Sequence, residues 1–294
     1  MKDRALSTLG LWVVVGLVIW VGGFFSVAEQ AAFGLLALLV GAAQYEFHQL
    51  ASRIPGVGRP SPTGIVAGFL LLFALFFLAN ERARANAVLT LGALLFGLHL
   101  LALLRRPGEV PTLLRRFPTL YGFAYIPFML ASLVAIARME DGQLLSRQPI
   151  GLYYVIWVVV ATKFTDVGGL LIGVPFGRHK IAPSISPAKS WEGCVGGLAF
   201  SAAASALFAW ICVGPLGLPF MTPAKAALMA LPLALLSIPS DLAESVFKRL
   251  AGAKDSGATI PGIGGALDLI DSLVLTAPTA LVLLSYGLDW AKRA

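Results

Sequence analysis

The sequence predicts an all-α, polytopic integral membrane protein with about nine transmembrane helices. Of its 294 residues, 58% are hydrophobic and only 13% are charged, whereas a soluble domain carries about 25% charged residues. A water-soluble chain of this size could not bury so much apolar surface in one core. The second observation is a series of long apolar runs, which excludes the short alternating strands of a β-barrel. Lipid is therefore the expected solvent.

Each apolar run is close to the roughly 20 residues that a membrane helix needs. In order, the expected spans are Leu9–Phe25, Ala31–Gln44, Gly64–Asn80, Asn86–Leu104, Thr119–Ala137, Gly151–Val174, Val195–Val213, Ala226–Phe247 and Leu269–Leu288. The first span follows Lys2 and Arg4 and precedes Ser26-Val27-Ala28, which resembles a signal-peptidase site. Its apolar run is longer than the roughly 7–15 residues of a signal peptide, so a retained helix is expected.

The basic residues predict the orientation. The net charge is +7, and the loops on one side of the expected spans hold roughly twice as many Lys and Arg as those on the other. The more basic side is expected to be cytoplasmic, so the N-terminus and the loops after the sixth and eighth spans face the cytosol of an inner or plasma membrane. This placement explains the positive charge without a nucleic acid partner. The two cysteines, Cys194 and Cys212, provide neither a disulfide framework nor a thiolate metal site.

Charged residues inside the spans concentrate in the second half of the chain. We therefore expect residues 1–150 to form an N-terminal membrane region (spans one to five) and residues 151–294 a catalytic region (spans six to nine). In the first half, Glu46 and His48 fall at a helix end, where an interfacial position is the simpler interpretation. In the sixth span, Lys163 and Asp166 share a helical face. A structural ion pair and a functional role both stay open for them.

The last two spans carry a stripe of acids. Residues spaced 3, 4 and 7 apart share one helical face, and such a set is Asp241, Glu244, Ser245 and Lys248. Asp268 and Asp271, at the start of the ninth span, are also expected on one face of a helix. Isolated acids here would protonate or block insertion. Several acids beside cations instead predict a water-accessible divalent-metal site, and oxygen ligands favour magnesium over zinc.

The sixth and eighth loops supply glycines and cations. The basic residues are Arg178, Lys180 and Lys189 in one loop and Lys248, Arg249 and Lys254 in the other. Glycine lets the backbone approach a phosphate closely, and Lys and Arg neutralise its oxygens. The P-loop pattern GxxxxGK[ST] is absent from the sequence. The residues alone predict metal-assisted phosphoryl or nucleotidyl transfer at the cytosolic face, without identifying the nucleotide.

At these residues the chain closely resembles the phosphatidate cytidylyltransferases, or CDP-diacylglycerol synthases. The signature of that family is matched by Ser245-Val246-Phe247-Lys248-Arg249, four residues, Lys254-Asp255-Ser256-Gly257, then Pro261-Gly262-Ile263-Gly264-Gly265 and Asp268-Leu269-Ile270-Asp271. Two further segments resemble family motifs, namely Phe176-Gly177-Arg178-His179-Lys180 and Ser186-Pro187-Ala188-Lys189-Ser190-Trp191-Glu192-Gly193. The resemblance extends over about Asp166–Ser272, and an extended motif with this spacing is highly specific.

The resemblance implies a nucleotidyltransferase of phospholipid biosynthesis. Such an enzyme transfers CMP from CTP to phosphatidic acid and gives CDP-diacylglycerol and pyrophosphate. It requires magnesium, and a monovalent cation such as potassium (K+) is associated with its site. Its partners are CTP, phosphatidic acid, the lipid bilayer and a second copy of itself in a homodimer, and no nucleic acid is implied.

The motifs also imply roles for individual residues. The expected metal ligands are Asp241, Asp268 and Asp271. The expected catalytic set is Asp241, Lys248, Arg249, Lys254 and Asp255, in which the basic residues contact phosphates and Asp255 orients Lys254 or a metal-bound water. The expected substrate-binding residues are Asp166, Lys180, Ser186, Lys189, Trp191, Glu192, Ser245, Gly264 and Gly265.

Three positions depart from the family pattern. Ile263 replaces the family His, Leu269 replaces the Arg between the last two acids, and Val167 replaces a Thr. Because the acids and the Lys-Arg pair remain, we expect an active variant. The changes at Ile263 and Leu269 leave open a CTP-dependent lipid kinase, or a synthase acting on another lipid phosphate. A transporter or a non-catalytic membrane scaffold is a third alternative, which paired broken helices in both halves would favour.

Overall fold

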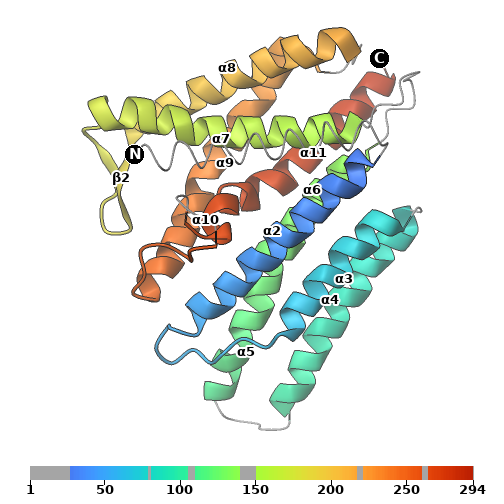
Figure 1. The fold of residues 1–294 in the computed structure, drawn as a ribbon, viewed down its shortest axis with the longest axis vertical. Helices are drawn as coiled ribbons and strands as arrows, with labels where there is room; N and C mark the ends of the chain where they lie inside the picture. The colour runs from blue at the N-terminus through green and yellow to red at the C-terminus, as the bar shows by residue number, and fades with distance from the viewer. Residues whose placement is uncertain are drawn as a thin grey trace. The chain divides into compact units, whose positions relative to one another are not determined.

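The computed structural model describes residues 27–78, 81–104, 110–139, 150–216, 221–259 and 264–293, and these are almost entirely helical (Figure 1). The helices are α2 (Ala28–Ala51), α3 (Thr63–Phe77), α4 (Glu81–Leu104), α5 (Val110–Phe123), the π-helical η1 (Ala124–Phe128), α6 (Met129–Ala137), α7 (Ile150–Phe176), α8 (Trp191–Leu216), α9 (Pro223–Leu250), α10 (Ala266–Ile270) and α11 (Leu273–Arg293). The two strands are β1 (Lys180–Ala182) and β2 (Ser186–Ser190). The predicted all-α class is confirmed.

Six helical segments among the described residues are long and apolar enough to cross a membrane. They are Ala28–Ala51, Phe117–Ala137, Ile150–Phe176, Trp191–Ile211, Pro223–Leu250 and Ala266–Gly287. Two more expected spans correspond to shorter apolar helices, Thr63–Phe77 and Ala83–Leu98. A helix of 15 residues is only about 22 Å long, less than the roughly 30 Å of bilayer hydrocarbon. The first expected span, Leu9–Phe25, lies outside the described residues, so the count of about nine spans is not confirmed.

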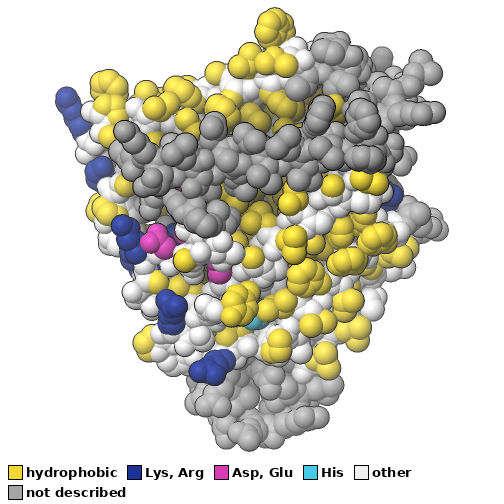
Figure 2. Space-filling model, viewed as in Figure 1, with side chains coloured by type: hydrophobic (Ala, Val, Ile, Leu, Met, Phe, Trp, Pro, Cys, Tyr) yellow, Lys and Arg dark blue, Asp and Glu magenta, His cyan; other side chains and the backbone are white. Residues whose placement is uncertain are grey.

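Apolar side chains cover the exposed faces of several helices. Figure 2 shows hydrophobic side chains spread widely over the described surface on the face in view. Leu70, Phe73 and Phe77 of α3 are exposed, as are Leu170 and Val174 of α7. Apolar surface on this scale is unusual for a soluble monomer, whereas hydrocarbon chains solvate it without cost. The outward faces therefore suit contact with lipid.

The chain divides into two compact units. The first comprises the described residues of Met1–Ala135 and Phe247–Ile270, and the second those of Ile136–Val246 and Asp271–Ala294. The compact units therefore do not follow the expected functional division at residue 150, which stays a prediction. Both units take residues from α9 and from the segment that follows it.

Aromatic packing fixes the first unit around α2. Phe47 of α2 lies edge-to-face against Phe247, with ring centroids 5.5 Å apart. Tyr121 stacks against Phe47 at 5.9 Å and contacts Phe247 at 5.0 Å. Such pairs contribute roughly 0.5–1.5 kcal/mol each beyond their buried area. This cluster holds α2, α5 and the last turns of α9 together.

Close helix packing organises the second unit. Helices α7 and α8 run side by side over much of their length (Figure 1). At Gly168 an added methyl group would overlap Phe200 and the carbonyl oxygen of Gly196, so glycine is required for this approach. The Thr162 hydroxyl lies 3.1 Å from that of Thr276 and links α7 to α11. These contacts place the polar face of α7 beside the start of α11.

A short hairpin replaces the loop expected after the sixth span. Strands β1 and β2 pair antiparallel, with Lys180 opposite Ser190 and Ala182 opposite Ser186. The hydroxyl of Ser190 accepts the N–H of Gly193 at 3.2 Å and so caps the N-terminus of α8, as serine does at many helix starts. This cap fixes the end of β2, the strand that carries Ser186 and Lys189.

Candidate functional site

A cluster of three carboxylates lies in the second unit. Asp241 and Glu244 come from α9, and Asp271 comes from the turn that follows α10. One oxygen from each group lies within 4.8 Å of the others. The side chain of Glu244 is fully buried and Asp271 is 8% exposed. Like charges this close repel and are costly within a membrane-spanning segment, so the arrangement favours a bound cation. We call Asp241, Glu244 and Asp271 the carboxylate cluster.

The position of Asp271 depends on a break in the last span. The sequence predicts one helix that carries both Asp268 and Asp271, but α10 ends at Ile270 and α11 begins at Leu273. The Ser240 hydroxyl donates to the carbonyl oxygen of Asp271 and accepts the N–H of Leu275 at 3.3 Å. It thus occupies the place of the i to i+4 hydrogen bond that a continuous helix would form. The expectation of one unbroken helix was wrong.

Two lysines lie against these acids. Lys189 of β2 forms an ion pair with Asp241. The ammonium nitrogen of Lys163 is 2.8 Å from the Ser272 hydroxyl, 3.7 Å from Asp166 Oδ2 and 3.9 Å from Asp271 Oδ1. Lys163 and Asp166 therefore form the ion pair that was one of the two alternatives left open by the sequence. The contact with Asp271 also places Lys163 beside the carboxylate cluster.

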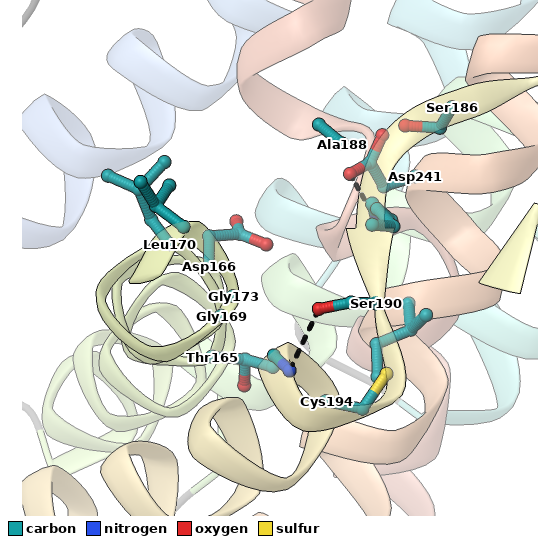
Figure 3. Close-up of a pocket in the computed structure, with 14 residues that line it drawn as sticks. Thr165, Asp166, Gly169, Leu170, Gly173, Ser186, Ala188, Ser190, Cys194 and Asp241 are labelled. Atoms are coloured by element: carbon teal, nitrogen blue, oxygen red, sulfur yellow. Dashed lines mark hydrogen bonds and ion pairs between the residues drawn. The ribbon is translucent and has the colours of Figure 1, made fainter. Parts of the chain in front are cut away.

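A cavity of about 320 Å³ opens beside the cluster, at the lower end of the usual range for ligand sites. Its polar wall consists of Thr165, Asp166, Ser186, Lys189, Ser190 and Asp241. Leu170, Val174 and Ile238 form an apolar side. In Figure 3 the carboxylate of Asp166 extends from α7 toward the side on which Asp241 and Ser190 lie. The cavity therefore offers charged and apolar surfaces to one ligand.

Not all residues expected around this cavity line it. Trp191 is 61% exposed and is absent from its wall. Glu192 instead accepts the N–H groups of Arg178 and His179 at 3.2 Å, and its Oε1 lies 2.6 Å from Nδ1 of His179. Glu192 thus fixes the base of the hairpin, and Lys180 is exposed at the start of β1. Substrate-binding roles for these residues stay predictions.

The described residues of the loop between α9 and α10, 251–259 and 264–265, belong to the first unit and contact Asp268. Oδ1 of Asp268 lies 2.7 Å from the ammonium group of Lys248. Its Oδ2 accepts the N–H of Ser256 at 3.0 Å, the Ser256 hydroxyl at 2.8 Å and the N–H of Gly265 at 2.9 Å. Four donors to one carboxylate make a rigid, charge-assisted network. We call residues 251–259 and 264–265 the α9–α10 loop.

Glu46 is a member of this arrangement that the sequence interpretation missed. An interfacial position was expected, but Glu46 is only 3% exposed, and it contacts residues of the α9–α10 loop and α10. His48 is also buried. These contacts were missed because the partners of Glu46 are more than 200 positions away in the sequence, and the expected interfacial position stays a prediction. The only sequence signal was a carboxylate within an apolar run, which is costly unless it is paired.

The comparisons with known proteins agree on one family. The family model described as the cytidylyltransferase family matches residues 2–287. The chain belongs to the cytidylyltransferase family. A phosphatidate cytidylyltransferase of Pseudomonas aeruginosa is 33% identical over 285 residues, which is 97% of this chain and 97% of the relative. One from Brucella suis is 32% identical over 276 residues, covering 92% and 87%. One from Mycobacterium tuberculosis is 38% identical over 132 residues, covering 45% and 38%.

The cytidylyltransferase signature is placed in both units. Asp241 and Asp271 lie in the carboxylate cluster, and the Ser245 hydroxyl is 3.4 Å from Asp241. In the first unit, Lys248 pairs with Asp268, while Lys254 and Asp255 are exposed. Residue Ile263 lies outside the described residues. The carboxylate cluster contains Asp241 and Asp271 together with Glu244, and Asp268 is not part of it. The predicted metal set of Asp241, Asp268 and Asp271 therefore stays a prediction.

Two further residues of the cytidylyltransferase signature shape the α9–α10 loop. Arg249 lies in the last turn of α9, and its Nη1 donates to the carbonyl oxygen of Ala253 at 3.4 Å. Gly264 has a φ of +123°, a backbone conformation that residues with a side chain rarely adopt. Position 264 therefore requires glycine, because the turn there brings Gly265 to Asp268.

Proposed function

We propose that this chain transfers the CMP group of CTP to phosphatidic acid, producing CDP-diacylglycerol and pyrophosphate. A phosphate oxygen of the lipid would attack the α-phosphorus of CTP, and the bond to the β-phosphate would break. The observation that carries the proposal is the buried carboxylate cluster in a chain whose relatives over nearly the whole length are named phosphatidate cytidylyltransferase. Helices long enough to cross a membrane suit an enzyme with a lipid substrate.

Magnesium is the cofactor that we propose for the cluster. Asp241, Glu244 and Asp271 offer three carboxylate oxygens within 4.8 Å of one another, and hard oxygen donors are the ligands that Mg²⁺ prefers. When bound, the ion would neutralise phosphate oxygens and the charge that develops on the leaving pyrophosphate. Potassium, implied by the resemblance, belongs to the same proposal.

The protein's own side chains would position and neutralise the substrates. Lys189, which pairs with Asp241 and lines the cavity, would contact a phosphate oxygen. The apolar side formed by Leu170 and Val174 suits the glycerol and acyl carbons next to a lipid headgroup. Lys248, Arg249 and Lys254 would contact phosphates, as the signature implies. In this scheme catalysis comes from alignment and electrostatic stabilisation, so a protein nucleophile is not required.

The proposal also covers the membrane topology and the oligomeric state of the protein. We propose about nine spans, an N-terminus and reactive groups on the cytoplasmic side, and a homodimer in the inner or plasma membrane. The excess of Lys and Arg in alternate loops supports the orientation. The functional division into residues 1–150 and 151–294 belongs here as well, because the cluster, the hairpin and the α9–α10 loop all lie in the later part of the chain.

Position-specific labelling of CTP tests the reaction. The purified protein in mixed micelles with phosphatidic acid should convert α-labelled CTP to a labelled CDP-lipid in the presence of Mg²⁺. With γ-labelled CTP, the label should appear only in pyrophosphate, in a one-to-one ratio with the lipid product. Label from the γ-position in the lipid would instead identify a CTP-dependent kinase and overturn the proposal.

Two controls make the labelling result specific. EDTA should abolish product formation, and magnesium-independent activity would contradict the proposed cofactor. The Asp268→Ala variant removes the carboxylate that Lys248, Ser256 and Gly265 contact, and should form little product. Activity of the wild-type preparation equal to that of this variant would attribute the product to a contaminant.

A further inference from the structure

We propose that Glu46 is a positioning residue, which holds the α9–α10 loop so that Asp268 and Lys248 keep their geometry. Its kinetic consequences rest on the proposed function, whereas its effect on the loop does not. Nothing in the signature motifs includes Glu46, which lies in the N-terminal helix α2. Its carboxylate is almost completely buried, so it can be retained there only with partners.

Three polar groups that are distant from Glu46 in the sequence converge on its carboxylate. Oε2 accepts the backbone N–H of Leu267 at 2.9 Å and lies 3.2 Å from the Ser256 hydroxyl. Oε1 accepts the hydroxyl of Thr259. One carboxylate thus contacts the α9–α10 loop at Ser256 and Thr259 and the first turn of α10 at Leu267. Hydrogen bonds to a charged acceptor are the stronger ones.

Ser256 connects Glu46 with Asp268. Its hydroxyl lies between the two carboxylates, 3.2 Å from Glu46 Oε2 and 2.8 Å from Asp268 Oδ2, and it accepts the N–H of Asp268 at 3.2 Å. Asp268 in turn pairs with Lys248 at 2.7 Å. A displacement of Glu46 is therefore transmitted through one serine to an acid and a lysine of the signature.

The glycines of the loop fit against this carboxylate. A methyl group at Gly257 would overlap Glu46 Oε1, and one at Gly265 would overlap Glu46 Oε2 and the Ser256 hydroxyl. Both positions therefore need glycine because Glu46 occupies the adjoining space. The neighbouring aromatic pair of Phe47 and Phe247 fixes α2 to α9 one residue away from Glu46 and Lys248. The close packing of the two glycines and the hydrogen bonds of Glu46 thus support the same position of the α9–α10 loop.

The test compares Glu46→Ala and Glu46→Gln with a matched control. The glutamine side chain would keep an acceptor oxygen for Leu267 and Ser256, so Glu46→Gln should retain most of the wild-type behaviour. The control is Gln44→Met on the same helix, because Gln44 is buried without a hydrogen-bond partner among the described residues. All variants are measured as full-length protein in detergent with matched lipid.

Amide hydrogen exchange is the readout that does not depend on activity. In Glu46→Ala, peptides that contain Ser256 and Leu267 should exchange at least about tenfold faster than in the wild type, while peptides from α7 stay unchanged. Glu46→Gln and Gln44→Met should remain within about threefold of the wild type. Unchanged exchange in Glu46→Ala would overturn the positioning role, whatever the enzyme catalyses.

The CTP dependence of CMP transfer provides the second readout, because Lys248 is proposed to contact a phosphate. The concentration of CTP at half-maximal rate should rise about tenfold in Glu46→Ala and return toward the wild-type value in Glu46→Gln. A smaller folded fraction alone would lower the rate without moving this concentration, and that result would contradict the positioning role. Absence of CDP-lipid in the wild type would instead refute the proposed function and leave the exchange result interpretable.

Discussion

The Asp271→Asn variant should lose CMP transfer by at least about a hundredfold, because it removes one of the three clustered carboxylates. Asparagine keeps the size of the side chain and removes its charge. The main chain at Asp271 is held by Ser240, and Lys163 retains its contacts with Asp166 and Ser272. The substitution should therefore leave the fold intact. The rate is measured with α-labelled CTP and phosphatidic acid over a range of Mg²⁺ concentrations.

Thermal unfolding separates this loss from misfolding. Without magnesium, Asp271→Asn should unfold at the same temperature as the wild type or higher, since it relieves repulsion among three acids within 4.8 Å. Added Mg²⁺ should raise the midpoint of the wild type and not that of the variant. Glu29→Gln, in the first turn of α2, makes the same chemical change outside the cluster and should behave as the wild type. Wild-type activity in Asp271→Asn would contradict a catalytic role for the cluster.

The Gly265→Ala variant should have the second largest effect, with CMP transfer reduced about a hundredfold. An added methyl group would overlap the Ser256 hydroxyl, the Glu46 carboxylate and the backbone nitrogen of Gly257. All of these are confined by packing and hydrogen bonds, so the loop must shift, at a cost of about 1–3 kcal/mol. The shift would also lengthen the 2.9 Å hydrogen bond from the Gly265 N–H to Asp268.

Gly34→Ala provides the matched control for this substitution. Gly34 lies in α2, and an added methyl group there meets no atom within 4 Å. Alanine should therefore be neutral, or stabilise the helix by about 0.5–1 kcal/mol. Activities are compared at equal amounts of folded protein, measured by size-exclusion chromatography. Equal activity of Gly265→Ala and Gly34→Ala would show that the close packing around Gly265 is dispensable.

The helices could be predicted from the sequence because their signal is local. Long apolar runs indicated α7, α8 and α9, and the acidic stripe on α9 indicated where polar groups would gather. Helix α3 was predicted as the span Gly64–Asn80 but ends at Phe77, and the hairpin of β1 and β2 was not predicted. Residue Leu78, after α3, adopts an extended conformation, and the hairpin depends on contacts between Glu192 and the backbone of Arg178 and His179. Neither the early end of α3 nor the hairpin has a hydropathy signal.

The sequence predicted the residue types of the candidate site more fully than it predicted which residues contact one another. Asp241 and Asp271 were expected together because both are acids in apolar spans and both match the resembled signature. The participation of Glu244 in the cluster, the inserted Ser240 hydroxyl and the contacts of Glu46 depend on which helix faces meet. Hydrogen bonds between residues 31 to 221 positions apart leave no periodic pattern in one sequence, so only the folded chain reveals them.

Metal binding at the carboxylate cluster is tested most directly by manganese, a paramagnetic and anomalously scattering substitute for magnesium. Crystals of the full-length protein soaked with Mn²⁺ and CTP should show an anomalous peak within about 2.0–2.4 Å of carboxylate oxygens of Asp241, Glu244 and Asp271. The peak should be absent from Asp271→Asn crystals treated in the same way. An Mn²⁺ ion that supports CMP transfer and binds elsewhere, with none at the cluster, would contradict the proposed site.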